Sequence, residues 1–441
     1  MITKKKSNIP TLPAGFFDIV PEDQKYWHFV WRKANGLLAD YSFNRLDMAP
    51  VEQVETFTRP VATSDPDIGK RLAAGKSHGM QLALRASMAP SFMRAYIQYG
   101  MHALPHPVKM FSSSAVLEPV ERGHRMHWQL AVQTIGDDSE AVDAELLFLG
   151  CRIMEALALG TFTVRLNTIG DSIGRPAYLR ALREFFKSNQ KKMSVHAVAI
   201  SRENPLRGLT VLASENIELA REAPQSVDFL SEEARAHFKH LLEFLDEGQV
   251  PYDIDHTLVT ADDFASHTVW QFVLDPVPAV PGSEGVDGIA AQAGLPVIYG
   301  NRMDRLSELL GGAKTPAAGW SLDIDSIVAR LKSRNSSVGE AGTRPKVFLS
   351  QLGEAAKKRS LMLFEQIRKS GIEVRYSLSR DTIKGQLRMA ARFGVRFALI
   401  FGQKEALEGT VILREMDTGI QETIPLEKII DELKKRLKKG V

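Results

Sequence analysis

Apolar and polar residues recur along the chain with the spacing of helices in some segments and of strands in others. Residues 23–41 place Trp27, Val30 and Ala34 at helical spacing, which predicts a long helix. Residues 111–136 instead predict two paired strands, over 115–118 and 128–135, around a charged loop. The pattern predicts further helices over 86–99, 140–159, 175–192, 231–247, 306–310 and 324–331, and further strands over 43–51, 162–169, 252–255, 268–273 and 291–300. Residues 56–79 show no clear period and are expected to be mainly loop.

The C-terminal part of the chain follows a more regular order of strands and helices. Strands are predicted over 346–349, 372–376, 396–401, 410–415 and 420–424, and helices over 354–370, 382–393 and after Pro425. This alternation predicts a small, mostly parallel α/β sheet with an antiparallel edge. A small, polar segment at 333–343 predicts a linker. The expected organisation is a disordered lead (1–12), a large domain (13–332), the linker, and a C-terminal domain (344–441).

Length and composition are those of an ordinary globular protein. The chain has 441 residues, 44% hydrophobic and 25% charged, which is enough for two or three domains. Its single cysteine, Cys151, excludes a disulfide framework and fits a reducing compartment. No apolar run reaches the roughly 18 residues that cross a bilayer, and the first residues lack the apolar core of a signal peptide. We therefore expect a cytoplasmic protein with no membrane partner.

Charge is unevenly distributed along the chain. The net charge is +3, but from Arg344 onward there are 21 Lys and Arg against 12 Asp and Glu, so the remainder is mildly acidic. A basic terminal module suggests a polyanionic partner such as RNA, and the sequence gives no indication of DNA binding. The alternative is that much of the excess, at 434–439, is only a solvated face at the C-terminal end of a helix. Composition leaves both interpretations open.

The loop between the paired strands carries two arginines, Arg122 and Arg125. Guanidinium groups on such a loop can bind the phosphates of a polyanionic ligand. The alternative is an exposed hairpin whose charges serve solubility. His124 and His127 flank the same loop, but exposed loop histidines explain them better than a metal site does. Because the eleven histidines show no zinc-binding spacing, we expect no metal.

A set of segments spread over nearly the whole chain matches one family pattern in order and spacing. The segments are GFFDIVPE at 15–22, PVE at 50–52, NPLR at 204–207, DFLSEEARAHF at 228–238, GWSLDID at 319–325 and two stretches within 385–425. Together they resemble the histidyl-tRNA synthetase family, which is a class II aminoacyl-tRNA synthetase family. The resemblance implies an α+β class II domain, an antiparallel sheet flanked by helices with a helical insertion around 170–250, followed by an α/β anticodon-binding domain. It also implies a homodimer.

The catalytic chemistry that the resemblance implies is missing at several positions. Motif 2 of the family places an arginine on the α-phosphate of ATP, where this chain has Val116. The arginine of motif 3 is replaced by Ser326, and the catalytic arginine of the histidine-recognition segment by Thr260. The other replaced positions are two tyrosines of that segment, here Phe264 and Ala265, and the glutamate that receives the substrate ammonium, here Ser87. Loss of one well-placed electrostatic group typically costs ~10²–10³ in rate, so we assign no catalytic residue.

Other family positions keep residues that could still contact a ligand. These residual candidates are Arg85, Glu118, Arg125, Gln129, Asp263, Arg302 and Asp304. The basic residues of the hairpin loop and the C-terminal domain supply candidates for RNA binding. These are Arg122, Arg125, Lys384, Arg388 and Arg392.

Three hypotheses of function follow. The main one is a synthetase-like protein that does not form histidyl-adenylate, requires no cofactor, and binds tRNA or another structured RNA. The second is a divergent but active histidine–tRNA ligase, which would use ATP, magnesium, histidine and tRNA. The third is a regulatory subunit of a partner enzyme, similar to the regulatory subunit of ATP phosphoribosyltransferase. A homodimer is expected, and a protein partner is left open.

Overall fold

The computed structural model describes residues 9–120, 123–276, 294–334, 345–377 and 382–438. The chain forms two compact units, Met1–Val338 and Gly339–Val441, which are described separately below. In the described residues, no helix combines the length and apolarity that crossing a membrane requires.

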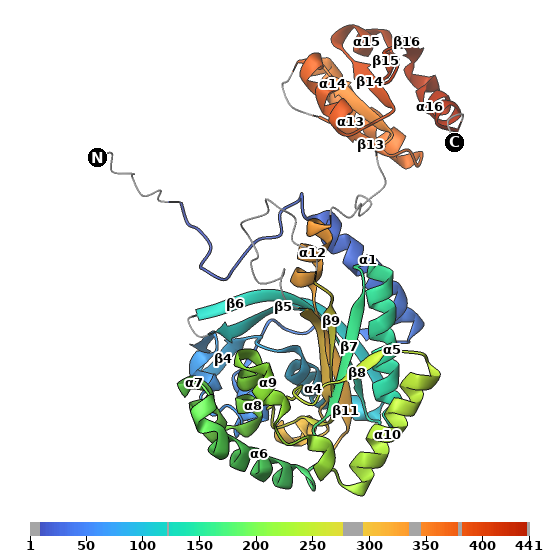
Figure 1. Ribbon diagram of the computed structural model, residues 1–441. Coiled ribbons are helices and arrows are strands. Elements are labelled where there is room, and N and C mark those ends of the chain that lie inside the picture. Colours follow the sequence, from blue (N-terminus) through green and yellow to red (C-terminus); the bar gives the residue numbers. More distant parts are fainter. Residues whose placement is uncertain (1–8, 121–122, 277–293, 335–344, 378–381, 439–441) are drawn as a thin grey trace. The chain divides into compact units, whose positions relative to one another are not determined.

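Eight described strands of the first unit form one sheet in the order β1-β5-β6-β11-β10-β9-β7-β8 (Figure 1). The bounds are β1 Asn44–Arg45, β5 Val108–Val120, β6 Gly123–Ile135, β11 Ala317–Asp323, β10 Leu295–Arg302, β9 Ser266–Leu274, β7 Phe162–Thr168 and β8 Tyr252–Ile254. The six inner strands pair antiparallel, whereas β1 joins β5 and β8 joins β7 in parallel. The class II fold is therefore confirmed, with a mixed rather than purely antiparallel sheet.

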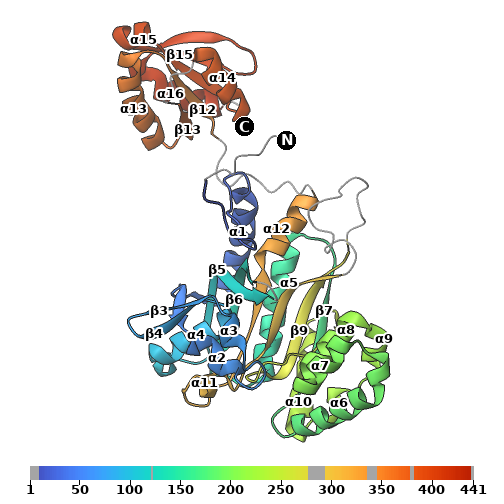
Figure 2. The same ribbon diagram turned by 90° about the vertical axis from the view of Figure 1, so that its left-hand side faces the viewer.

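A layer of long helices covers one face of this sheet (Figure 2). These helices are α1 Gln24–Asp40, α5 Glu140–Leu157, α10 Glu232–Glu247 and α12 Ile324–Ser333. Trp27 and Val30 of α1 belong to the same buried cluster as Leu147 of α5 and Trp270 of β9. The predicted helices 23–41, 140–159 and 231–247 are thus confirmed, because their apolar stripes are long enough to define a period.

The hairpin β5–β6 is much longer than the sequence pattern suggests. Its register continues without a break from Val108↔Ile135 to Val120↔Gly123. The predicted strands, 115–118 and 128–135, and the predicted loop were therefore wrong in extent, because the charged residues Glu118 and Arg125 are themselves a cross-strand pair. Arg122 lies outside the described residues.

The free edge of the hairpin is capped by other parts of the first unit. The Met126 N–H donates to the carbonyl oxygen of Gly15 at 2.9 Å. The Trp128 N–H donates to Oδ2 of Asp325 at 3.2 Å. Gly15 has φ +85°, and a Cβ there would meet the His124 carbonyl oxygen at 2.2 Å, so the close approach requires glycine.

Residues 56–79, expected to be mainly loop, contain short regular elements instead. These are α2 Glu55–Thr58, η1 Arg59–Val61, α3 Ile68–Arg71 and β3 Ala74–Ser77. Strand β3 pairs with β4 (Met80–Leu84), and β4 pairs with β2 (Val51–Gln53) in a separate three-stranded sheet. Helices of four residues are too short to produce a visible period, which is why the pattern missed them. The predicted strand 43–51 divides into β1 and β2.

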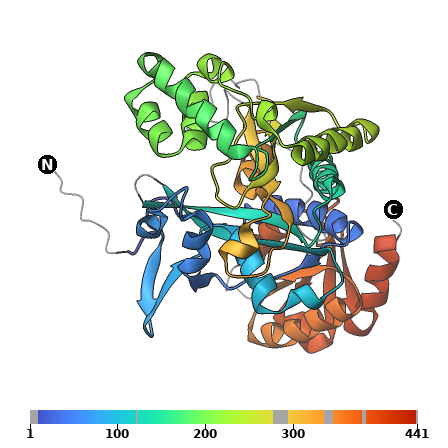
Figure 3. The same cartoon turned by 90° about the horizontal axis from the view of Figure 1, so that it is seen from below.

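The remaining helices of the first unit lie before the hairpin, after β10, or in a group that follows β7. Two of them precede the hairpin, namely α4 Met88–Gln98 and η2 Met101–Ala103. One follows β10, namely α11 Leu306–Leu309. The insertion group is α6 Arg175–Asn189, η3 Gln190–Lys192, α7 Val195–Glu203, α8 Pro205–Glu215, α9 Ile217–Arg221 and η4 Ser226–Phe229. The insertion helices gather to one side of the sheet (Figure 3) and share their own buried cluster, which includes Tyr178, Leu182 and Leu209.

The second unit has a five-stranded sheet in the order β13-β12-β14-β15-β16. Its elements are β12 Val347–Gln351, α13 Glu354–Lys369, β13 Val374–Tyr376, α14 Ile383–Arg392, β14 Phe397–Phe401, α15 Gln403–Glu408, β15 Thr410–Glu415, β16 Gln421–Pro425, η5 Leu426–Lys428 and α16 Ile429–Lys438. Strands β13, β12 and β14 are parallel, and β15 and β16 add an antiparallel edge. This arrangement confirms the predicted α/β sheet, and only the short helix α15 was missed.

Candidate adenylation cavity and basic helix

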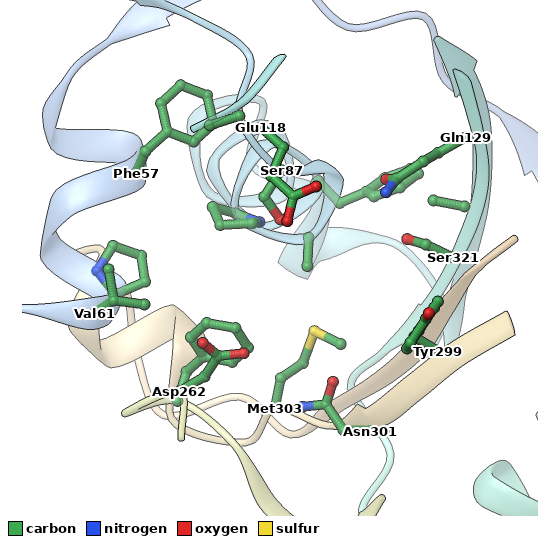
Figure 4. Close-up of a pocket in the computed structure, with 18 of the residues that line it drawn as sticks. Phe57, Val61, Ser87, Glu118, Gln129, Asp262, Tyr299, Asn301, Met303 and Ser321 are labelled. Carbon is green, nitrogen blue, oxygen red and sulfur yellow. The ribbon is translucent and has the colours of Figure 1, made fainter. Parts of the chain in front are cut away.

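A cavity of about 670 Å³ opens beside the hairpin in the first unit. It is lined by residues of the hairpin, of the start of α4, of α3, and of strands β10 and β11. Figure 4 shows Glu118, Gln129, Tyr299, Ser87 and Asp262 around it. It is the place where the family resemblance locates the ATP and histidine sites. We call it the large cavity.

Beneath the large cavity lies an apolar cluster. Val116 of β5 is completely buried and packs in one cluster with Met88, Phe264 and Met303. Phe264 and Met303 also line the large cavity, but Val116 does not. Val116 and Phe264, where the family resemblance implies an arginine and a tyrosine, therefore belong to one buried apolar cluster.

The charged side chains that line the large cavity are mostly acidic. Among the described lining residues, Asp65, Glu118, Asp262 and Asp323 face only two arginines, Arg71 and Arg125. One of these cations is already engaged, since Arg71 forms a salt bridge with Asp65. A bound polyphosphate would therefore meet more negative than positive charge.

Burial affects several titratable groups around the large cavity. Burial lowers the pKa of His127, although Asp323 and Glu118 act in the opposite direction, so the ring is neutral at pH 7. Burial also raises the pKa of the Asp262 carboxyl, and Asp263 adds to that rise.

The carboxyl of Asp325, at the start of α12, also has a raised pKa. Burial, with the negative charge of Asp323, raises the pKa of Asp325 to about 7. Its Oδ1 is buried and has no hydrogen-bond partner among the described residues.

Two arginines that the sequence retains serve as structural groups rather than lining the large cavity. Arg85 is buried, and its Nη2 donates to the carbonyl oxygens of Met48, at 2.7 Å, and Ala49. Arg302 is completely buried, and its Nη1 lies 2.9 Å from Oδ1 of the fully buried Asp143. These guanidiniums hold neighbouring segments together and are not directed at a ligand.

The network around Arg302 extends over several elements. Its Nη2 lies 3.3 Å from Oδ1 of Asp304 and donates to the Asp137 carbonyl oxygen at 3.0 Å. The other oxygen of Asp143 accepts from Thr268 at 2.7 Å and lies 3.0 Å from Nε2 of His237.

The structure brings together some predicted site residues and separates others. Glu118, Arg125, Gln129, Ser87 and Phe264 line the large cavity. Asp263 accepts the backbone N–H groups of Thr63 and Ser64, and Asp304 accepts the Ser266 hydroxyl. Thr260 bonds to Asp262, Ser326 bonds to Asp323, and Ala265 lies in a second cleft.

Several lining residues were not among the predicted candidates. They are Asp65, Arg71, Asp262, Tyr299 and Asp323. Asp262 and Asp323 lie within segments used for the family resemblance, so their charge was visible in the sequence. Asp65 and Arg71 lie in the segment that was expected to be loop. Within the described part of the chain, no group of three His, Cys, Asp or Glu residues is arranged to hold a metal ion.

The basic candidates of the second unit lie on one exposed face of α14. Lys384, Arg388 and Arg392 are four residues apart, all exposed, and therefore stack along one side of the helix. Gln386 and Ala390 on the other side are buried.

The mixed sheet with its helical layer and insertion, together with the α/β second unit, defines a class II aminoacyl-tRNA synthetase with an anticodon-binding domain. The family model described as "Histidyl-tRNA synthetase" matches residues 15–327, and the model "Anticodon binding domain" matches residues 346–436. The chain belongs to the histidyl-tRNA synthetase family.

Similar proteins extend over nearly the whole chain. The histidine–tRNA ligase of Dehalococcoides mccartyi is 32% identical over 429 residues, covering 96% of this chain and 99% of that protein. The histidine–tRNA ligase of Pelotomaculum thermopropionicum is 26% identical over 434 residues, covering 97% of this chain and 98% of that protein. The apo histidyl-tRNA synthetase of Staphylococcus aureus superposes with a TM-score of 0.76 at 25% identity, covering 96% of this chain and 99% of the other. The predicted family is therefore confirmed.

Proposed function

We propose that this chain is a histidyl-tRNA synthetase-family protein that binds tRNA or another structured RNA and does not form histidyl-adenylate. The observation that carries the proposal is the charge of the large cavity, where Arg71 is paired with Asp65 and the other three carboxylates face one further arginine, Arg125. Amino-acid activation requires cationic groups directed at phosphoryl oxygens as negative charge develops.

The lining residues do not fit a nucleoside triphosphate. Val116 replaces the motif 2 arginine and is buried in the apolar cluster below, where it cannot donate a hydrogen bond. Neither Arg85 nor Arg302 can substitute for it, because both are buried and bonded elsewhere. We therefore derive no catalytic step through ATP, and we expect no requirement for ATP or magnesium.

The second candidate is an active histidine–tRNA ligase. The observation in its favour is the 32% identity to a curated histidine–tRNA ligase over 96% of this chain, which by itself supports an ordinary ligase better than an inactive relative. In this case Arg71 and Arg125 would have to hold the phosphates. Substitution of either arginine by alanine would then abolish aminoacylation.

Histidine-dependent exchange of pyrophosphate into ATP separates the two candidates. We expect exchange by the purified full-length chain to stay at the level of a no-enzyme control, while an active relative assayed in parallel exchanges readily. Calorimetric titration with histidine should show no binding, and any binding of ATP should be unchanged in the R71A and R125A variants. Exchange well above the control that disappears in the R71A and R125A variants would overturn the proposal and establish the ligase.

RNA binding has its own test, directed at α14. Binding of tRNA should weaken steeply with salt, because lysines and arginines displace counterions from the phosphates. The K384A/R388A/R392A variant should lower the slope of log affinity against log salt by about 2, since each phosphate contact contributes ~0.7–0.9. A matched variant, K434A/K435A/K438A, removes three exposed lysines of α16. If only the α16 variant weakens binding, the assignment to α14 is wrong.

Assembly and location belong to the same proposal. A homodimer is supported by the exposed apolar residues Val51, Met80 and Leu84 on the small sheet β2–β4–β3, which are 43%, 47% and 37% exposed. Light scattering on the purified chain tests it, and a monomeric mass would refute it. A cytoplasmic location stays a prediction. Co-purification with a phosphoribosyltransferase subunit would favour the regulatory-subunit hypothesis.

A further inference from the structure

A second cleft of about 360 Å³ lies in the first unit, where α6 meets the start of β9 and the residue before α11. It is lined by Ser172, Arg175, Pro176, Leu179, Arg180, Arg183, Ala265, Ser266 and Arg305. Four of these nine residues are arginines, and none is acidic. We call it the arginine cleft.

Helix α6 presents one face to the arginine cleft. Pro176, Leu179, Arg180 and Arg183 have the spacing i, i+3, i+4 and i+7, which places them along one side of the helix. Arg180 and Arg183 are exposed, so their guanidiniums are accessible from solvent. The N-terminal end of this 15-residue helix adds a favourable partial charge for anions.

The other two arginines are fixed by backbone contacts. The Nη2 of Arg175 donates to the Ala265 carbonyl oxygen at 2.6 Å. The Nη1 of Arg305 donates to the Asp263 carbonyl oxygen at 3.1 Å. The Nε of Arg175 is buried and has no hydrogen-bond partner within the described residues. Each guanidinium is therefore positioned by one contact and keeps donors that a ligand could use.

The two carboxylates that act on the charge of Arg175, Asp171 and Asp263, accept hydrogen bonds from other groups. Asp171 accepts from the backbone N–H groups of Ile173 and Gly174 and from the Ser231 hydroxyl. Asp263 accepts two backbone N–H groups. Within the described ranges, no ion pair joins any of the four guanidiniums to a carboxylate.

The surroundings of Arg175 disfavour its positive charge. Burial, with the neighbouring Arg305, lowers the pKa of Arg175 to about 10, against weaker opposing effects of Asp171 and Asp263. A bound anion would stabilise the charged form of Arg175, because its negative charge offsets the repulsion from Arg305.

We propose that the arginine cleft binds the phosphate or diphosphate group of a small phosphorylated compound. Arginine forks match phosphate oxygens in geometry and charge, and Leu179 and Pro176 offer apolar contact to a small organic part. The volume suits one such group rather than a long polymer segment. This inference does not depend on the proposed loss of adenylation.

Titration of the full-length chain with inorganic phosphate and with pyrophosphate tests the proposal, using calorimetry and ³¹P line broadening. We expect one site per chain and tighter binding of pyrophosphate. The R180A/R183A variant should weaken binding about 100-fold or more, which corresponds to the loss of two charge-assisted hydrogen bonds of ~1.5 kcal/mol each. Both side chains are exposed, so thermal unfolding of this variant should match the wild type.

A matched control and an RNA arm make the outcomes distinct. The K187A/K192A variant removes two exposed cations from the same helical region without altering the arginine cleft, and it should bind pyrophosphate like the wild type. Equal binding by the wild type and R180A/R183A would overturn the proposal, as would no binding up to about 10 mM. If R180A/R183A weakens tRNA binding while neither phosphate probe binds, the site contacts an RNA backbone and the small-ligand assignment is wrong.

Discussion

The large cavity and the arginine cleft lie in the same unit and show opposite electrostatics. The large cavity is lined by four carboxylates, and burial together with the lining residue Asp323 raises the pKa of the nearby Asp325 to about 7. In the arginine cleft guanidiniums crowd together, and the pKa of Arg175 is lowered to about 10. In each region, a ligand of the opposite charge would reduce the repulsion between the like-charged side chains. Four arginines thus gather at the insertion helix α6, whereas carboxylates outnumber arginines in the cavity where the family resemblance locates the ATP site.

Arg302 holds the fold together and does not line the large cavity, so its substitution should have the largest effect on stability. Arg302→Ala should lower the free energy of unfolding by roughly 3–5 kcal/mol, because it leaves the buried Asp143 without its partner. Urea denaturation measures the change. Arg165→Ala, which removes an exposed arginine 3.8 Å from Asp255, should cost less than about 1 kcal/mol. Equal costs for the two variants would contradict the structural role.

Val116 tests whether the position of the motif 2 arginine can still hold a charge. Val116→Arg should lower the free energy of unfolding by about 3 kcal/mol, since the new guanidinium would be buried in the apolar cluster with Phe264 and Met303. Val116→Leu, which keeps the apolar character, should cost about 1 kcal/mol. Denaturation of both variants at pH 7 measures the difference. If Val116→Arg is as stable as Val116→Leu, the arginine side chain reaches the large cavity and our description of the cluster fails.

Asp325 provides a test that depends on pH. Its pKa is about 7 in the folded chain against an ordinary value of 3.8, so the native state holds the proton more tightly than the unfolded state. Below pH ~4 the carboxyl is protonated in both states and has no effect. Stability is then lost as pH rises towards 7, and the loss is complete above that value.

Asp325→Asn removes this pH-dependent loss. We expect it to match the wild type near pH 4 and to be more stable by on the order of 2 kcal/mol at pH 8. Denaturation across this pH range measures the difference. Asp138→Asn, which neutralises an exposed carboxylate, serves as the control. A difference that does not change with pH would mean that the pKa of Asp325 is not raised in the folded chain.

Much of the fold could be predicted from the sequence. Helices such as α1 and α5 carry apolar stripes over several turns, and the second unit has regular alternation, so both were predicted correctly. The short elements between Glu55 and Ser77 and the full length of β5–β6 were not, because their pairing is set by tertiary contacts rather than by local period.

The candidate site was less predictable than the fold. Arg85 and Arg302 are present in the sequence, but only the contacts with Met48 and Asp143 reveal that they are structural. The arginine cleft joins Arg175 to Arg305 across a long stretch of chain, and no local motif announces it. Val116, where the family resemblance implies an arginine, was visible in the sequence, and the structure adds where its side chain packs.

The two capped amides of the hairpin have a consequence for self-association. A strand edge with free N–H groups is a template onto which another chain can add a strand, and this is a common start of aggregation. Here the Met126 N–H is occupied by the Gly15 carbonyl oxygen and the Trp128 N–H by Asp325. The segment around Gly15 therefore covers part of the edge of the longest hairpin in the described chain, and its removal would leave the Met126 N–H free to pair with a strand of another chain.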